Sequence, residues 1–284
     1  MNLPPAIEAQ IRDIPMISEV ATKLLNIVAN PKHSVKNVVT VIEQDVYLTA
    51  RIIRVANSAA FNRGNEITSI QRAVLHLGES FVTGIAIKTS TGEMLTGELE
   101  GYDSPEGELW RHCLQAAFAA REVAKLSKGR VMPDQAYTAG LLMDVGMAIM
   151  SGHISKHSVE IIRRLDSGEH ADFTEMERDT IGVDHAQVGW ELAAHWTLPE
   201  SLAIGIRDHH HPSRAPEEYR PLVYALHIAD LIARMAGFGV GSEALQYSLD
   251  EGYLAYYRLD SKNISELMLV VMDEFSKVER SLFS

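Results

Sequence analysis

The sequence predicts an all-α protein. Apolar residues recur at helical spacing along most of the chain, as in residues 17–28, where Val20, Leu24 and Val28 fall on one face. Residues that favour helix starts, such as Ser18 and Ser34, precede several of these segments. We find no convincing alternation of apolar and polar residues of the kind that marks a half-buried strand. Together these observations favour helices throughout the chain.

The first 95 residues are expected to form an N-terminal helical lobe. Its helices are predicted over residues 17–28, 34–42, 48–56, 70–77 and 81–87. Ser18, Ser34 and Ser69 can each cap a helix, and Gly78 can end one. Residues 91–108 then carry glycines and a proline among acidic residues, which is typical of a loop. This loop is the best candidate for the boundary between lobes 1–95 and 96–284, and it could also be an excursion on the surface of a single domain.

The second lobe is also predicted to be helical. Its helices are expected over residues 108–126, 133–150, 155–165, 185–196, 200–209, 221 onward and 264–278. Asp184 can cap the helix that follows it, and Thr174 with Glu177 three residues later resembles a capping box. The apolar helix near the C-terminus could dock on its own chain or on a second subunit, so the sequence leaves the oligomeric state open.

Composition and charge exclude several classes of function. The formal net charge of −12 would repel nucleic-acid phosphates and anionic lipids, so we expect neither nucleic acid nor a membrane as a partner. The most apolar stretch, Leu222–Gly241, is interrupted by His227, Asp230 and Arg234 and is too polar to span a bilayer. The single cysteine, Cys113, cannot form an intrachain disulfide, and no signal peptide is apparent. We therefore expect a cytoplasmic protein.

Two carboxylates lie in otherwise apolar helical segments. Asp144 has leucine and valine as near neighbours in the sequence, and Asp230 has alanine, leucine and isoleucine. An ionised carboxylate in such surroundings is costly unless it is paired with a cation or bound to a metal. Histidines that are candidate ligands lie elsewhere on helices, at His112, His185, His209 and His210. Each histidine alone is more often a packed or surface residue, and spacing does not bring separate helices together.

The order and context of these residues resemble the HD superfamily of metal-dependent phosphohydrolases. The matching positions are His112, Asp144, His185, His209, His210 and Asp230. The surrounding sequence is similar in Gly140-Leu141-Leu142-Met143-Asp144-Val145-Gly146, in Gly182-Val183-Asp184-His185 and in His227-Ile228-Ala229-Asp230. The resemblance implies that these residues are metal ligands gathered in one site.

The N-terminal half narrows the resemblance to the HDOD family, the HD-related output domains of bacterial signalling. The motifs that carry it are Ile14-Pro15, Gln44-Asp45, Val55-Ala56-Asn57-Ser58-Ala59 and Ile67-x-Ser69-Ile70. The resemblance covers about residues 10–235. It implies a regulatory output module, usually without hydrolase activity, in which an N-terminal helical bundle packs on an HD-like helical lobe.

Met143 departs from the pattern of catalytic relatives, which carry a histidine directly before the aspartate. The residues that would hold a first metal are His112, Met143, Asp144 and Asp230. Those that would hold a second metal are Asp144, His185, His209 and His210. The first set has lost a ligand, because a neutral thioether binds hydrolytic metals poorly, and the second set is complete. Three histidines and one carboxylate suit Fe, Zn, Ni or Mn, so we expect one bound metal rather than two.

Two further departures concern the substrate. Met147 stands where HD hydrolases often carry a lysine that can assist a phosphate. The Gly-Tyr-Pro signature of cyclic-dinucleotide phosphodiesterases does not follow His211-Pro212, so we do not expect hydrolysis of cyclic di-GMP.

We therefore expect a non-catalytic signalling output module that acts through contacts with a signalling protein partner. A small phosphate-containing ligand could bind in a groove near the site. The alternative is an active metal-dependent phosphohydrolase that attacks a nucleotide or another phosphate ester with a metal-bound water. A third alternative is a metal-free helical scaffold, in which the histidines merely hydrogen-bond the buried carboxylates.

Overall fold

The computed structural model describes the whole chain except residues 1–2, 63, 158–172, 238, 241–248 and 283–284. The described residues contain helices and no β-strand, with a single isolated antiparallel bridge between Leu99 and Ser104. The prediction of an all-α fold is confirmed. None of the helices in these parts of the chain combines the length and the apolar character that a membrane crossing requires.

In the N-terminal lobe, α2 and α5 begin directly after the serines that were predicted to cap them. Its helices are α2 (Glu19–Ala29), α3 (Val35–Ile42), α4 (Val46–Ala56), α5 (Ile70–Leu77) and α6 (Glu79–Thr91). The hydroxyl of Ser18 accepts a hydrogen bond from the backbone N–H of Ala21 at 3.1 Å, which satisfies a donor that the first turn leaves open. Ser69 caps α5 in the same way, and α5 ends at Leu77 before Gly78, which has a φ of 86°.

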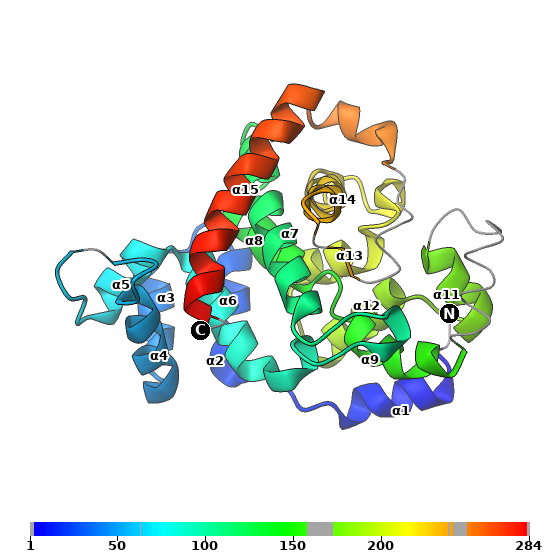
Figure 1. The fold of residues 1–284 in the computed structure, drawn as a ribbon, viewed down its shortest axis with the longest axis horizontal. Helices are drawn as coiled ribbons and strands as arrows, with labels where there is room; N and C mark the ends of the chain where they lie inside the picture. The colour runs from blue at the N-terminus through cyan, green and yellow to red at the C-terminus, as the bar shows by residue number, and fades with distance from the viewer. Residues whose placement is uncertain (1–2, 63, 158–172, 238, 241–248, 283–284) are drawn as a thin grey trace.

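The first helix, α1 (Pro5–Asp13), lies against the second lobe rather than beside α2 to α5. It packs on α9 (Met147–Ile154) and α12 (His185–His195) (Figure 1). Just after α1, two backbone carbonyls contact the end of α12. The indole N–H of Trp196 donates to Pro15 O at 3.1 Å, and a ring nitrogen of His195 lies 2.9 Å from Ile14 O. The chain therefore fastens the two lobes together at its N-terminal end.

The second lobe is built around α7 (Glu108–Lys125), which packs against α8, α14 and α15 (Figure 1). Besides α9 and α12, its other helices are α8 (Pro133–Leu142), α11 (Phe173–Ile181), α13 (Glu200–Asp208), α14 (Arg220–Met235) and α15 (Ser261–Leu282). Short 3-10 turns connect them: η1 (Gly92–Leu95), η2 (Glu100–Tyr102), η3 (Ser155–His157), η4 (Pro212–Arg214) and η6 (Glu251–Ala255). The C-terminal helix α15 docks on its own chain and buries Val271, Phe275 and Val278.

Buried apolar residues of both lobes form one hydrophobic cluster, because α2 and α6 pack directly on α8. The predicted N-terminal bundle packed on a second helical lobe is thus observed. The loop-like segment 91–108 contains the short turns η1 and η2, and Tyr102 in η2 is fully buried. The segment is therefore fixed against the second lobe by a buried aromatic side chain.

One predicted helix is wrong. The expected continuous helix over residues 133–150 is broken by a turn at residues 143–146, between the end of α8 at Leu142 and the start of α9 at Met147. Gly146 ends this turn, and a Cβ atom there would lie 2.0 Å from the carbonyl oxygen of His185 and 2.6 Å from the backbone nitrogen of Gly189. The turn therefore lets two backbones approach closely. Of the helix expected over residues 155–165, only the 3-10 turn η3 lies within the described residues.

Gly146→Ala should destabilise the protein by about 1–3 kcal/mol or more, because the added methyl group overlaps the backbone of α12. Urea unfolding of the variant and the wild type would measure the loss. The matched control is Gly152→Ala on α9, where an added Cβ meets no atom within 4 Å. That substitution should be neutral or stabilise by roughly 0.5–1 kcal/mol through helix propensity. Equal stability of the two variants would contradict the close approach.

Candidate metal centre

The structure brings the predicted ligands together from separate elements. His112 comes from α7, Asp144 from the turn before α9, His185 from the start of α12, and Asp230 from α14, while His209 and His210 follow α13. The donor atoms form two sets that share Asp144: one with His112 and Asp230, the other with His185, His209 and His210, and within each set the atoms lie within 4.8 Å of one another. All of these residues are buried except His210, which is half-buried.

In the first set, the imidazole of His112 bridges two carboxylates. Its Nε2 lies 3.0 Å from Asp144 Oδ2 and 3.2 Å from Asp230 Oδ1, and all three side chains are almost fully buried. Burial alone would lower the pKa of His112, but the hydrogen bonds to the two carboxylates outweigh it and raise the pKa to about 10. His112 is therefore an imidazolium at neutral pH and supplies positive charge to this set.

A second cation, absent from the sequence-based list of ligands, also belongs to the first set. The Nε atom of Arg234 lies 2.9 Å from Asp230 Oδ1, the same oxygen that faces His112, and its side chain is only 5% exposed. Burial would raise the pKa of Asp230, but the charge of Arg234 and the hydrogen bond from His112 lower it to about 2. The spacing of four residues on one helix is the signal that could have identified this pair.

In the second set, a ring nitrogen of His209 and a carboxylate oxygen of Asp144 face each other. The Nδ1 of His209 lies 2.8 Å from the carbonyl oxygen of Ile206, so in the neutral ring Nδ1 carries the proton and Nε2 is an acceptor. That Nε2 lies 3.3 Å from Asp144 Oδ1, and neither atom has a hydrogen-bond partner among the described residues. Buried acceptors that face each other are unfavourable unless a cation lies between them.

His185 and His210 complete the second set. The Nε2 atoms of these two residues lie 2.9 Å apart, and the Nε2 of His185 lies 3.6 Å from Asp144 Oδ1. Burial and the neighbouring histidines hold the pKa of His210 well below its usual range, so its ring stays neutral and can offer a lone pair. Neutral imidazole nitrogens and a carboxylate oxygen are the donor types that borderline divalent metals prefer. The second set therefore fits a metal ion.

Glu177 orients His185. Its carboxylate is fully buried, and Oε2 accepts from the backbone N–H of His185 and lies 2.8 Å from Nδ1, while Oε1 accepts from the hydroxyl of Tyr102. A carboxylate on Nδ1 fixes the tautomer of a metal-binding histidine and directs the Nε2 lone pair toward the metal. The capping box expected from Thr174 and Glu177 is wrong, because Thr174 lies inside α11 and Glu177 turns to His185.

His227 supports the His209–His210 segment from α14. Its Nδ1 lies 2.8 Å from the backbone carbonyl oxygen of His209, and its Nε2 accepts from the backbone N–H of Asp250 at 2.9 Å. Both ring nitrogens are therefore used in positioning the chain rather than in binding an ion. Met143 and Met147 are fully buried in the hydrophobic core. Cys113 is also buried, and burial raises its pKa, in agreement with the packed thiol expected from the sequence.

A sequence model of the HDOD domain matches residues 14–212, which is more than half of the chain. An uncharacterized protein of Treponema pallidum (strain Nichols) is 26% identical over 263 residues, which cover 92% of this chain and 49% of that protein. The chain thus spans about half the length of this relative.

Solved structures show the same fold. An HDOD domain protein of unknown function from Geobacter sulfurreducens has a TM-score of 0.73 at 22% identity and covers 98% of this chain and 97% of its own. A signal transduction protein from Marinobacter aquaeolei VT8 has a TM-score of 0.78 at 20% identity, over 99% of this chain and 61% of that one. A protein from Shewanella amazonensis SB2B, whose name describes it as a phosphohydrolase, has a TM-score of 0.63 at 24% identity. The match covers 96% of this chain and 98% of that one. At these identities the likeness concerns the fold alone.

The bridging imidazolium makes a prediction about pH. Because the pKa of His112 rises from 6.5 to about 10 on folding, its contribution to the stability of metal-free protein is complete below pH 6.5 and is lost as pH rises toward 10. We expect unfolding free energy in the presence of a chelator to fall across this range. His112→Gln should remove that slope, whereas His157→Gln, at an exposed position on η3, should keep it. Parallel pH profiles for wild type and His112→Gln would contradict the assignment.

Proposed function

The chain belongs to the HDOD family, and from this premise we propose that it is a non-catalytic output module of bacterial signalling that holds one divalent metal ion. The metal would be Fe, Zn, Ni or Mn, held by Asp144, His185, His209 and His210. The module would act in the cytoplasm through a signalling protein partner. The proposal rests on how the two sets of residues that share Asp144 differ: the first set contains its own cations, and the second set presents acceptor atoms.

The second set supports metal binding because its unsatisfied atoms are acceptors. His209 Nε2 and Asp144 Oδ1 are buried and lie 3.3 Å apart, and in the neutral ring of His209 both atoms are acceptors. Glu177 directs the Nε2 lone pair of His185 into the same space. A scaffold in which the histidines merely hydrogen-bond the carboxylates would need a proton on both ring nitrogens of His209, because Nδ1 already faces the carbonyl oxygen of Ile206. A metal ion would satisfy these atoms together.

The first set argues against a second metal because organic cations already balance its carboxylates. His112 contributes an imidazolium between Asp144 and Asp230, and Arg234 contributes a guanidinium on Asp230. A divalent ion there would have to displace a proton from His112 and remain close to Arg234. Met143 adds no ligand in the position where catalytic relatives carry histidine.

A single metal disfavours phosphoester hydrolysis of the two-metal type. Two metal ions roughly 3.5–4 Å apart stabilise both the attacking and the leaving oxygen of an in-line displacement. The alternative is a phosphohydrolase that uses one metal, and the name of the Shewanella amazonensis relative is consistent with it. The half-buried position of His210 is the observation that favours this alternative, because it leaves one ligand open to a small molecule.

Purified protein loaded with Mn, Fe, Ni or Zn in turn should contain about one metal ion per chain. His209→Ala should lose this metal, and its melting temperature should no longer rise when metal is added, because binding to the folded state is what stabilises it. Elemental analysis and thermal unfolding would measure both effects. His157→Ala, at an exposed site, is the control and should retain the ion. Metal-free wild type after loading, or two ions per chain, would contradict the proposal.

The same loaded samples test catalysis. We expect no turnover of a panel of nucleotides and phosphate esters with added Mn or Fe. Turnover that His209→Ala abolishes would establish the phosphohydrolase alternative and overturn the output-module proposal.

Glu177→Gln should weaken metal affinity by about 10- to 100-fold, because a neutral amide holds the Nδ1 proton of His185 less firmly than a carboxylate does. Competition titration against a chelating dye would measure the change. Glu175→Gln, at an exposed position on the same helix, should leave affinity unchanged. Equal affinities in the two variants would show that Glu177 does not act through the metal ligand.

A further inference from the structure

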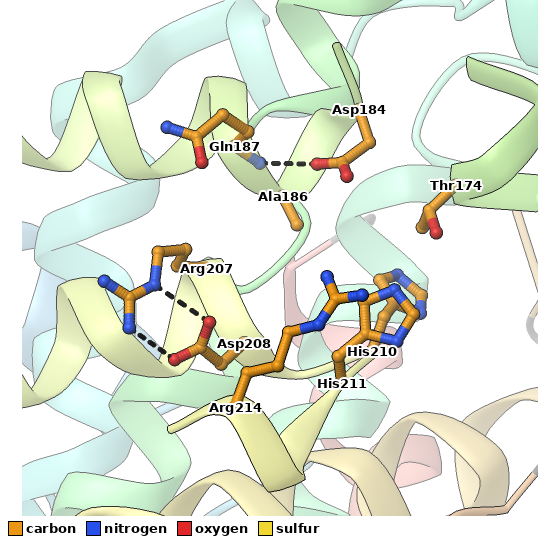
Figure 2. Close-up of a pocket in the computed structure, with 9 residues that line it drawn as sticks. All are labelled: Thr174, Asp184, Ala186, Gln187, Arg207, Asp208, His210, His211 and Arg214. Carbon is orange, nitrogen blue, oxygen red and sulfur yellow. Dashed lines mark hydrogen bonds and ion pairs between the residues drawn. The ribbon is translucent and has the colours of Figure 1, made fainter. Parts of the chain in front are cut away.

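A cavity of about 310 Å³ lies beside His210 on the side of the site that faces the start of α12 and the turn η4. Figure 2 shows the cavity with Asp184 and Gln187 on one wall, Arg207 and Asp208 on a second, and Arg214 with His210 and His211 on a third. His210 is the one residue that belongs both to this lining and to the second set of candidate ligands. The cavity therefore adjoins the candidate metal centre without being made of its ligands.

The two carboxylates that line the cavity are already paired. Asp208 accepts from Arg207 through both oxygens, at 2.8 Å from Nε and 2.6 Å from Nη2. Asp184 accepts from the backbone N–H of Gln187 as the cap of α12 and forms an ion pair with Arg178. Their negative charges are therefore balanced within the protein, so neither carboxylate repels an anion as a free carboxylate would.

Arg214 differs from the other arginines around the cavity. Its guanidinium makes no hydrogen bond or ion pair with any part of the chain that the structure describes, whereas Arg207 is held by Asp208 and lies over the ring of Trp190 at 4.7 Å. Figure 2 shows the Arg214 side chain extending from η4 toward the rings of His210 and His211. A planar guanidinium with its donors uncommitted matches two oxygens of a phosphoryl group.

We propose that this cavity binds the phosphoryl group of a small phosphorylated metabolite, with Arg214 as its principal cation. The inference rests on the proposed function, because an anion in this place would lie between Arg214 and a metal held by His210 and its neighbours. The volume of 310 Å³ is at the lower end of ligand-pocket sizes, which limits the occupant to a sugar phosphate or a mononucleotide. The ligand would be the signal to which this output module responds.

Isothermal titration of the metal-loaded protein, with residues 1–284 intact, with inorganic phosphate and with ribose 5-phosphate tests the proposal. We expect both probes to bind and to raise the melting temperature, and malonate, a dicarboxylate of similar size, to bind at least tenfold more weakly. Arg214→Ala should weaken phosphate binding by tenfold or more. Arg214→Lys should weaken it by less, because lysine keeps the positive charge but loses the paired N–H donors of the planar guanidinium. Arg72→Ala, at another exposed position on α5, removes the same charge and should have no effect.

The metal content of each sample separates this inference from the proposed function. Protein that contains metal but does not bind phosphate, or that binds it equally well after Arg214→Ala, overturns the phosphoryl site and leaves the metal proposal standing. Protein that binds phosphate through Arg214 but contains no metal after loading overturns the metal proposal and retains the anion site. Binding of malonate as tight as that of phosphate would also overturn the assignment to a phosphoryl group.

Discussion

The buried carboxylate of Asp144 is the interaction on which the rest of the second lobe depends. Its two oxygens face different partners, Oδ2 toward His112 and Oδ1 toward His185 and His209. An ionised carboxylate with no exposed surface is costly unless charges or strong hydrogen bonds surround it. Helices α7, α12, α13 and α14 must therefore converge on the turn that carries it. The close contact of Gly146 with the backbone of α12 is the local means by which that turn reaches the centre.

The supporting contacts extend from Asp144 into both lobes. His185 is held by Glu177, Glu177 is held by Tyr102, and Tyr102 lies in the segment between the two lobes. On the opposite side, Trp196 at the end of α12 donates to the carbonyl of Pro15, where the chain leaves α1. The helix that presents His185 is thus tied at its start to the segment between the lobes and at its end to the N-terminal part of the chain. The cavity beside His210 meets the same group of histidines from a third direction.

Local signals in the sequence predicted most of the helices but not how the chain passes between them. Ser18, Ser69 and Asp184 cap helices as expected, because a cap depends only on residues a few positions away. The turn at residues 143–146 was missed because apolar residues continue through it, and only the backbone of α12, far along the chain, explains Gly146. Glu177 was assigned to a cap for a similar reason, since its partner His185 lies beyond one helical turn. The six candidate ligands were grouped by resemblance alone, because no spacing connects residues of different helices.

The loss of a ligand at Met143 is not sufficient by itself to limit the site to one metal. Catalytic metals are commonly held by only three protein ligands, and His112, Asp144 and Asp230 would still supply three. Arg234 makes the difference, because its Nε lies 2.9 Å from Asp230 Oδ1, the oxygen that also faces His112. With Arg234 in place, His112 can keep its proton and the two carboxylates remain neutralised without an ion. In the second set no arginine is paired with Asp144 among the described residues, and in the neutral ring of His209 the facing atoms of His209 and Asp144 are both acceptors. The two halves therefore differ in the charges that face their carboxylates, and the second is the half whose donor atoms could hold a metal ion.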